Sequence, residues 1–213
     1  IYVGHPLLDV LKKNVKENLN REKLIALLPG SRDQEISKIL PEMLSVTKYF
    51  KNYQFLICAA PSKNKSFYEK FIAGSDYQNV DIVEDQTYNI LERSSAALVT
   101  SGTATLEAAL IKTPQIVCYK SSWISILIGK FLLRNLKFIS LVNLILNKDA
   151  VKELIQNDLN TKNILEELEI ILSEDGKNTM IEYYNELENL LNKKGASRET
   201  AKKIINYHLE SNS

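Results

Sequence analysis

Short apolar runs that alternate with longer amphipathic stretches limit the fold of this sequence more than any other feature. Six runs have the length and composition of strands: Lys23–Leu28, Gln54–Ala60, Val80–Val83, Ala96–Thr100, Gln115–Tyr119 and Phe138–Val142. The stretches between them are expected to be helices: Asp33–Lys51, Lys63–Ala73, Thr87–Arg93, Thr103–Ile111 and Ser122–Leu133. This alternation is typical of βαβ units, and strands that are apolar throughout fit a parallel sheet covered on both faces. We therefore predict a doubly wound α/β domain over residues 20–156.

Beyond Asp149 the pattern becomes helical throughout. The expected helices are Asp149–Asn157, Thr161–Ser173, Lys177–Asn192 and Ser197–Leu209. In the second of these, Ile164, Leu165, Leu168, Ile171 and Leu172 recur at helical spacing, and we expect them to pack on a partner surface. Residues 157–213 are thus predicted to be a C-terminal helical extension.

The charge of the chain argues against a nucleic-acid partner, because its net value is only +1. From Ala108 to Lys148, however, there is no Asp or Glu among several Lys and Arg residues, a pattern that fits phosphates, anionic lipid head groups or plain solvated surface. Within it, Trp123–Arg134 is apolar around most of a helix but shorter than the roughly 18 residues that span a bilayer. Burial against protein and contact with a membrane or acyl chains both fit this segment.

The two cysteines, Cys58 and Cys118, lie in apolar runs without a CxxC neighbour or a nearby His. Buried, reduced thiols fit this placement, and a metal site does not. The first residues, Ile1–Pro6, resemble the end of a strand that runs into a turn, so we expect further sequence upstream. His5, between Gly4 and Pro6, is expected to act in a hinge.

The first junction that carries chemistry is the one after the strand ending at Leu28. Pro29 and Gly30 end the strand, and Ser31 with Gln34 has the spacing of a capping box. Arg32 then projects from the first helical turn, beside the positive end of the helix dipole. Backbone N–H groups and a guanidinium at that place favour a diphosphate, and a capped helix with a surface arginine is the alternative.

The second junction follows the strand ending at Thr100. Gly102 allows a ligand oxygen to approach the backbone, and Ser101 and Thr103 add hydroxyl groups beside the exposed N–H groups. Glu107 lies one helical turn after Thr103, where a carboxylate accepts hydrogen bonds from ribose hydroxyls in dinucleotide-binding folds. An ordinary Ser/Thr-rich helix start is the alternative here. Together the two junctions indicate nucleotide binding.

Several familiar motifs are missing from the sequence. It contains no GxxxxGK[ST] loop and no GxGxxG after the first strand, which argues against an ATPase or an ordinary dinucleotide-binding enzyme. It has no Gly-x-Ser-x-Gly elbow, and its two histidines, His5 and His208, lie near opposite ends of the chain. A Ser-His-Asp hydrolase is therefore not expected.

The ordered set of motifs resembles the lipid-A-disaccharide synthases, glycosyltransferases of the GT-B type. The similarity rests on Leu28–Ile36 and Ser101–Glu107, and Ser140–Leu144 and Val151–Gln156 strengthen it. Tyr2–Leu7 matches the family's crossing between its two Rossmann-like domains. The resemblance implies an interdomain crossing over residues 1–19 and a Rossmann-like UDP-sugar-binding domain over residues 20–156, which is the C-terminal half of a GT-B fold.

The resemblance also implies a reaction. These enzymes transfer a diacylglucosamine unit from its UDP derivative to the 6-hydroxyl of lipid X, so that the β-1,6-linked lipid A disaccharide forms and UDP leaves. The general base is expected in the N-terminal domain, and this half alone is expected to be inactive. GT-B enzymes generally use no metal, and the sequence contains no Asp-x-Asp, so neither a metal nor a cofactor is expected.

At matching positions the resemblance assigns site residues. It places Arg32 at the diphosphate, Ser101, Gly102 and Thr103 at phosphate and ribose, and Glu107 at the ribose hydroxyls. The rest of the donor pocket would be lined by Asn143, Glu153 and Gln156. One departure is Asn147–Ala150, because a glycine or proline often precedes the family's equivalent of Val151.

The partners that the resemblance implies are the UDP-diacylglucosamine donor, lipid X, and a second subunit that exchanges C-terminal tails in a homodimer. It places the enzyme in the cytoplasm, peripherally on the inner face of the inner membrane of a Gram-negative bacterium. Two alternatives share the fold: another GT-B enzyme, such as a UDP-GlcNAc 2-epimerase, and a Rossmann-like binding module without catalytic activity.

Overall fold

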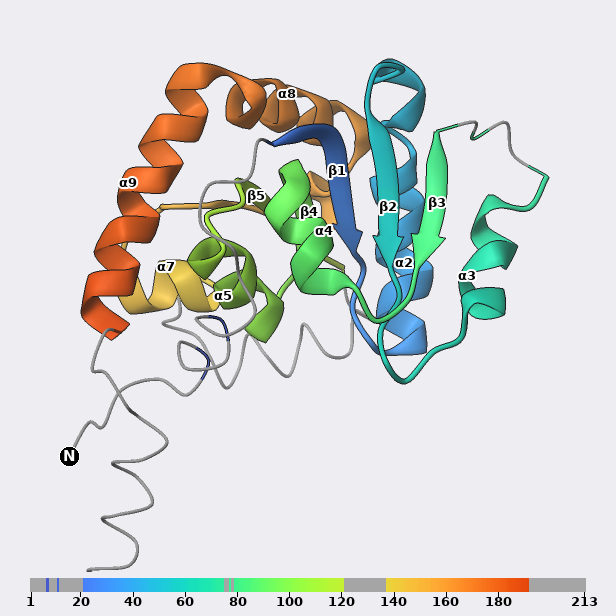
Figure 1. The fold of residues 1–213 in the computed structure, drawn as a ribbon, viewed down its shortest axis with the longest axis horizontal. Coiled ribbons are helices and arrows are strands. Elements are labelled where there is room, and N and C mark those ends of the chain that lie inside the picture. Colours follow the sequence, from blue (N-terminus) through green and yellow to red (C-terminus); the bar gives the residue numbers. More distant parts are fainter. Residues whose placement is uncertain are drawn as a thin grey trace, which may run out of the picture.

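The structure, a computed structural model, describes residues 7, 11, 21–74, 77, 79–120 and 137–191. Six strands in these ranges form one sheet: β1 (Glu22–Leu28), β2 (Gln54–Cys58), β3 (Val80–Val83), β4 (Ser94–Thr100), β5 (Gln115–Tyr119) and β6 (Lys152–Ile155). All pairs are parallel, and the order is β3-β2-β1-β4-β5-β6 (Figure 1). Dinucleotide-binding folds have this order, because their two βαβ halves wind outward from the centre of the sheet. The predicted doubly wound α/β fold is confirmed.

Helices connect these strands, and two more, α8 and α9, follow the last strand. They are α2 (Asp33–Leu44), α3 (Lys65–Ile72), α4 (Thr87–Arg93), α5 (Thr103–Leu110), α7 (Leu141–Leu146), α8 (Thr161–Leu172) and α9 (Glu174–Leu191), with short turns η1 (Thr47–Tyr49) and η2 (Gln156–Asp158). The helix predicted over Asp33–Lys51 ends earlier, at Leu44. There the hydroxyl groups of Ser45 and Thr47 donate to backbone carbonyl oxygens, which competes with continued helix.

Both faces of the sheet are buried, as the apolar strands predict. In β1, Ile25 and Leu27 belong to one apolar cluster with α2 and α8, while Leu24, Ala26 and Leu28 belong to a second cluster with α4. Figure 1 shows α4 in front of the sheet and α2 behind it. Alternation along a strand sends successive side chains to opposite faces, so a strand apolar at every position is stable only between two layers of helix.

Two predicted elements are wrong in type. Phe138–Val142 is not a strand, because Ser140 caps α7 by accepting a hydrogen bond from the Asn143 N–H, and the helix runs on from Leu141. Asp149–Asn157 is not a helix, because it contains β6, which pairs along β5 from Ile116–Lys152 to Tyr119–Ile155. Val151, Leu154 and Ile155 have helical spacing, but the free edge of β5 offers backbone hydrogen bonds that select the strand.

The extension is also more closely joined to the sheet than the sequence suggests. Ile164, Leu168 and Ile171 of α8 are buried in the chain's own core, so the prediction that they pack on a partner surface is wrong. The helix α9 begins at Glu174 rather than Lys177 and contributes the wholly buried Tyr184, whose hydroxyl group accepts a hydrogen bond from the Gln115 side chain of β5.

A half-buried arginine joins several segments at the amino end of β1. Arg21, just before β1, donates to the carbonyl oxygens of Leu91, Ser94, Ile111 and Lys112 and to the Thr113 hydroxyl, at 2.6–3.1 Å. It thereby ties together the ends of α4 and α5, where helix carbonyls lack partners of their own. Burial lowers the pKa of this guanidinium, which stays charged because its ordinary pKa is very high.

Several predictions fall outside the described residues. They are the helices expected over 122–133 and 197–209, the hinge at His5, and most of the crossing at Tyr2–Leu7. The membrane or acyl-chain contact of Trp123–Arg134 and the exchange of tails also depend on such residues and stay predictions. Among the described residues, no helix combines the length and the hydropathy needed to cross a membrane.

Candidate nucleotide-sugar site

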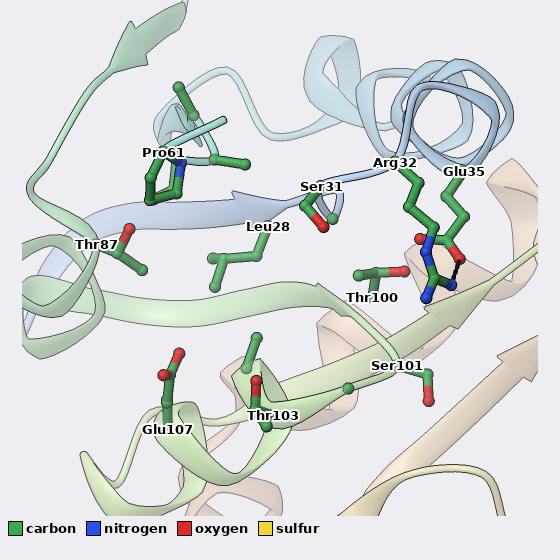
Figure 2. Close-up of a pocket in the computed structure, with 16 residues that line it drawn as sticks. Leu28, Ser31, Arg32, Glu35, Pro61, Thr87, Thr100, Ser101, Thr103 and Glu107 are labelled. Atoms are coloured by element: carbon green, nitrogen blue, oxygen red, sulfur yellow. Dashed lines mark hydrogen bonds and ion pairs between the residues drawn. The ribbon is translucent and has the colours of Figure 1, made fainter. Parts of the chain in front are cut away.

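A pocket of about 370 Å³ opens at the carboxyl ends of β1 and β4 (Figure 2). These two strands are neighbours at the centre of the sheet, where the chain order reverses and where open α/β sheets bind their ligands. Its lining residues are Leu28, Gly30, Ser31, Arg32, Glu35, Cys58, Ala59, Ala60, Pro61, Thr87, Thr100, Ser101, Gly102, Thr103, Ala104 and Glu107. The volume suits a small organic ligand or one part of a larger one.

Gly30 brings the two junctions into contact. Its φ is +98°, a backbone conformation that side chains disfavour, and a Cβ built there would lie 2.9 Å from Cγ2 of Thr100. The turn after β1 therefore packs directly against the end of β4. This close approach places the start of α2 and the start of α5 on two sides of one pocket.

Arg32 stands at the start of α2 as its N-cap residue. The predicted capping box of Ser31 and Gln34 is not formed, since no side chain caps this helix within the described residues. The Arg32 side chain is 80% exposed, and its Nη1 lies 2.9 Å from Oε1 of Glu35, one turn further along (Figure 2). An exposed pair of this kind contributes little stability, so an anion that enters the pocket competes with Glu35 at small cost.

Gly102 begins α5 on the other side. Its φ of +149° and ψ of −162° belong to a region that is essentially restricted to glycine, and a Cβ added there would meet nothing within 4 Å. Ser101 beside it donates its hydroxyl to the Ile139 carbonyl oxygen at 2.9 Å, which anchors the loop to the segment before α7. Because Gly102 has no side chain, the backbone at the mouth of the pocket is open to a ligand. The hydrogen bond of Ser101 fixes the position of this backbone.

Replacing Gly102 by alanine is expected to strain the backbone without crowding any neighbour. We expect the free energy of unfolding to fall by about 1–3 kcal/mol, the usual cost of a disfavoured conformation. Chemical denaturation of the variant measures this loss. Gly74→Ala is the matched control, because Gly74 also has a positive φ (+74°) and an open Cβ position. Gly74 follows α3 and does not line the pocket. The control loses stability without loss of ligand binding; equal binding by the Gly102 variant contradicts a role of this backbone at the site.

The helices around the pocket differ from the others in their caps. Away from the pocket, the N-termini of α3, α7 and α8 are each capped by a side chain, those of Asn64, Ser140 and Asn160. At the pocket, no side-chain hydrogen bond within the described residues caps α2, α4 or α5. The first N–H groups of α2 and α5 therefore keep their donor capacity, and the helix dipoles favour an anion there.

Glu107 supplies a carboxylate on the wall formed by α5. It points into the pocket across from Thr87 (Figure 2), and its Oε1 accepts a hydrogen bond from the Tyr88 hydroxyl at 3.2 Å. Burial raises the pKa of the Glu107 carboxyl, and the hydrogen bond from Tyr88 offsets part of that rise. The Glu107 carboxylate offers hydrogen-bond acceptors, which suit the ribose hydroxyls of a nucleoside diphosphate. Arg32 and the N–H groups of the helix starts offer donors, which suit its diphosphate.

Of the eight site residues predicted from the sequence, five line this pocket: Arg32, Ser101, Gly102, Thr103 and Glu107. Asn143 is not among the residues that line this pocket, and its predicted contact with the donor stays a prediction. Asn143 is wholly buried; its amide donates to the Val151 carbonyl and to Glu153, and accepts from the N–H groups of Ala150 and Val151.

Glu153 is likewise absent from the lining. Its two carboxylate oxygens accept hydrogen bonds at 2.9 Å from the N–H groups of Ile139 and Ser140 and from the Asn143 amide. Because the Ile139 carbonyl in turn accepts from Ser101, Glu153 and Asn143 stabilise the segment to which the Ser101 loop is anchored. The predicted contact of Glu153 with the donor stays a prediction. Gln156 follows β6 with a φ of +57°, and its Nε2 is buried without a partner in the described part of the chain; its predicted contact with the donor stays a prediction.

Metal binding and nucleophilic catalysis have few candidate groups among the described residues of the site. Among the described residues, no group of three His, Cys, Asp or Glu side chains is arranged to hold a metal ion. Cys58 lines the pocket as a free thiol, and burial raises its pKa to about 12, which keeps it protonated and a poor nucleophile.

The fold is that of one Rossmann-like half of a GT-B fold. Two solved structures share the fold. The Staphylococcus aureus MnaA–UDP co-structure aligns over 98% of this chain and 54% of its own length, with a TM-score of 0.65 and 14% identity. ADP-heptose LPS heptosyltransferase II of Escherichia coli aligns over 78% of this chain and 50% of its own, with a TM-score of 0.50 and 12% identity.

The sequence narrows this class to one family. The family described as lipid-A-disaccharide synthetase matches residues 1–206, and the chain belongs to it. A curated relative, the lipid-A-disaccharide synthase of Syntrophus aciditrophicus, is 38% identical over 206 residues, which are 91% of this chain and 53% of the relative. The chain thus spans about half the length of the curated relatives that it matches.

Proposed function

We propose that this chain is the donor-binding half of a lipid-A-disaccharide synthase and that its pocket holds the UDP part of a UDP-diacylglucosamine. One observation carries the proposal: the N-termini of α2 and α5, which no described side chain caps, line one pocket at the sheet's centre, with Arg32 on one side and Glu107 on the other. Family membership supports the substrate class. The alternative of a 2-epimerase shares the fold but not the family.

In this assignment the diphosphate lies between the two helix starts. Arg32 leaves Glu35 and binds the diphosphate oxygens, while Gly102 and Thr103 offer N–H and hydroxyl groups. The Glu107 carboxylate accepts from the ribose hydroxyls. When the sugar is transferred, negative charge grows on the β-phosphate of the leaving UDP. Fixed dipoles and a guanidinium stabilise that charge more in the transition state than in the ground state, which is what accelerates the reaction.

The remaining parts of the reaction are assigned outside the described pocket. The base that activates the 6-hydroxyl of lipid X is proposed to come from an N-terminal domain, as in the two-domain arrangement of the family. A peripheral location on the inner membrane and a tail-exchanged homodimer complete the proposal. These assignments suit a donor and an acceptor that both carry acyl chains.

A thermal-shift experiment with UDP tests the binding role. A ligand that binds only the folded state stabilises it, by about 2.7 kcal/mol at a concentration of 100 times Kd. For a chain of this size that corresponds to a rise in Tm of roughly 5–10 °C. Uridine, which lacks the diphosphate, serves as the control and should shift Tm much less. A Tm that UDP leaves unchanged at millimolar concentration rejects the assignment.

The carboxyl group of Glu107 predicts how binding depends on pH. Its pKa is raised by burial, and ribose hydroxyls need the ionised form as acceptor. UDP affinity should therefore fall as the pH is lowered through this raised pKa. Calorimetric titrations at a series of pH values measure the effect, and Glu107→Gln should lose this part of the pH dependence, leaving that of the UDP phosphate. An identical pH profile for both proteins contradicts the role of Glu107.

The same shift has the opposite consequence for the free protein. A carboxyl whose pKa is raised by folding contributes stability that is present below its unfolded pKa and is lost as the pH rises through the folded pKa. Without UDP, Glu107→Gln should therefore raise Tm at neutral pH and give no gain in acid. Loss of affinity with gain of stability is characteristic of a residue kept for binding.

A further inference from the structure

Tyr88 is the nearest described partner of the carboxylate that faces the proposed ribose. It is the second residue of α4, and its ring packs, partly buried, on the apolar cluster between α4 and the sheet. Together with Gln86, Thr87 and Asn89 it lines a hollow that adjoins the main pocket, and Glu107 belongs to both hollows. The tyrosine therefore reaches Glu107 from the adjoining hollow, which Arg32 does not line.

The hydrogen bond between the two side chains is specific in direction. The Tyr88 hydroxyl donates to Oε1 of Glu107 at 3.2 Å, and within the described part of the chain no other side chain donates to this carboxylate. Oε1 is thereby fixed, while Oε2 keeps its acceptor capacity for a ligand. A glutamate has three rotatable side-chain bonds, and a hydrogen bond to one of its oxygens restricts that freedom before a ligand arrives.

We propose that Tyr88 is a positioning residue that holds the Glu107 carboxylate toward the ribose and so sets the preference of the site for ribose over deoxyribose. The inference rests on the proposed function, because it assigns the ribose to Glu107. It adds a residue of α4 that touches the carboxylate rather than the substrate.

The other charged groups around Glu107 do not replace this contact. Arg32 and Glu35 line the main pocket from α2, and Asp85 lines the adjoining hollow from the loop before α4. Arg32 is paired with Glu35, and Asp85 repels a carboxylate. Burial raises the pKa of Tyr88, and its proximity to Glu107 raises it further, so the hydroxyl keeps its proton and remains a donor at neutral pH.

Calorimetric titration of the full chain with UDP and with 2′-deoxy-UDP tests the role. Tyr88→Phe removes only the hydroxyl group and should weaken UDP binding about 3- to 10-fold, which is the range for the net contribution of one ordinary hydrogen bond. Binding of 2′-deoxy-UDP should weaken less, so the ratio of the two Kd values moves toward one. In a Glu107→Gln background the same change should have almost no effect on UDP, because the positioned group is gone.

Tyr53→Phe is the matched control, since Tyr53 precedes β2 at the opposite end of the strands and packs edge-on against Phe50. It should leave both Kd values unchanged. A Tyr88→Phe variant that weakens UDP and 2′-deoxy-UDP equally, or neither, overturns the positioning role while the binding site stands. Absence of UDP binding by the unchanged chain overturns the proposed function and the role of Tyr88 together.

Discussion

Asn143→Ala is expected to lower the free energy of unfolding by about 3–5 kcal/mol, the range for breaking a buried polar network that includes a charge. The Asn143 amide makes four hydrogen bonds at 2.8–2.9 Å, two as donor and two as acceptor. Alanine leaves the N–H groups of Ala150 and Val151 without partners in a buried place, and it removes a donor from Glu153. Each buried group left unsatisfied costs about 1–3 kcal/mol.

The network also explains a loop whose sequence departs from the family pattern. Asn147 takes the left-handed conformation, with a φ of +50°, at the end of α7, and the chain then turns into β6. The Asn143 side chain holds the far end of this turn through the two N–H groups that follow it. A glycine or proline is therefore not needed to shape the loop, because a buried amide fixes it.

Chemical denaturation measures the loss, with Asn157→Ala as the control. Asn157 is exposed in η2, and its replacement should change stability by no more than about 0.5 kcal/mol. Asn143→Asp should be nearly as damaging as alanine, because it removes both donors and adds a charge beside Glu153. A loss below about 1 kcal/mol for Asn143→Ala contradicts the network as described.

Five of the six strands were predictable because they are short apolar runs, and the central ones, β1, β4 and β5, are buried on both faces. An apolar run bounded by turn residues has few other uses, so β3 and β5 begin and end where the sequence predicts. The segments at 138–142 and 149–157 were not predictable, because what decides them lies outside a local window. Ser140 becomes a helix cap, and Lys152–Ile155 becomes a strand, only once the edge of β5 is available beside them.

The site divides in the same way. Gly30, Arg32 and Gly102 are visible in the sequence, because turn formation and helix starts are local properties of a few consecutive residues. The contacts of Arg21 are not, since its acceptors lie 70–92 residues away along the chain. The contact of Tyr88 with Glu107 and the burial of Asn143 likewise become visible only in the packed fold. A resemblance transfers such residues to the site but does not say which of them face the ligand.

Arg32→Ala is expected to weaken UDP binding by about 1.5–3 kcal/mol, the range for a hydrogen bond to a charged group, which is roughly 10- to 150-fold in Kd. The side chain is 80% exposed and paired only with Glu35 among the described residues, so the free protein should lose almost no stability. Isothermal titration of the variant, with its Tm measured alongside, separates the two effects. Lys38→Ala on the same helix is the control, because it removes an equal charge that does not line the pocket.

The ligand series decides what Arg32 touches. If Arg32 binds the diphosphate, its loss should weaken UDP binding strongly and leave the weak binding of uridine unchanged. Arg32→Lys should recover only part of the affinity for UDP, since an ammonium group cannot bind two phosphate oxygens side by side. Equal weakening of UDP and uridine would place Arg32 at the nucleoside instead. If Lys38→Ala weakens UDP binding as much as Arg32→Ala does, Arg32 contributes only a general electrostatic attraction of the anion. A guanidinium placed to stabilise the leaving UDP requires two results. The loss of affinity must occur with Arg32→Ala but not with Lys38→Ala, and it must occur for UDP but not for uridine.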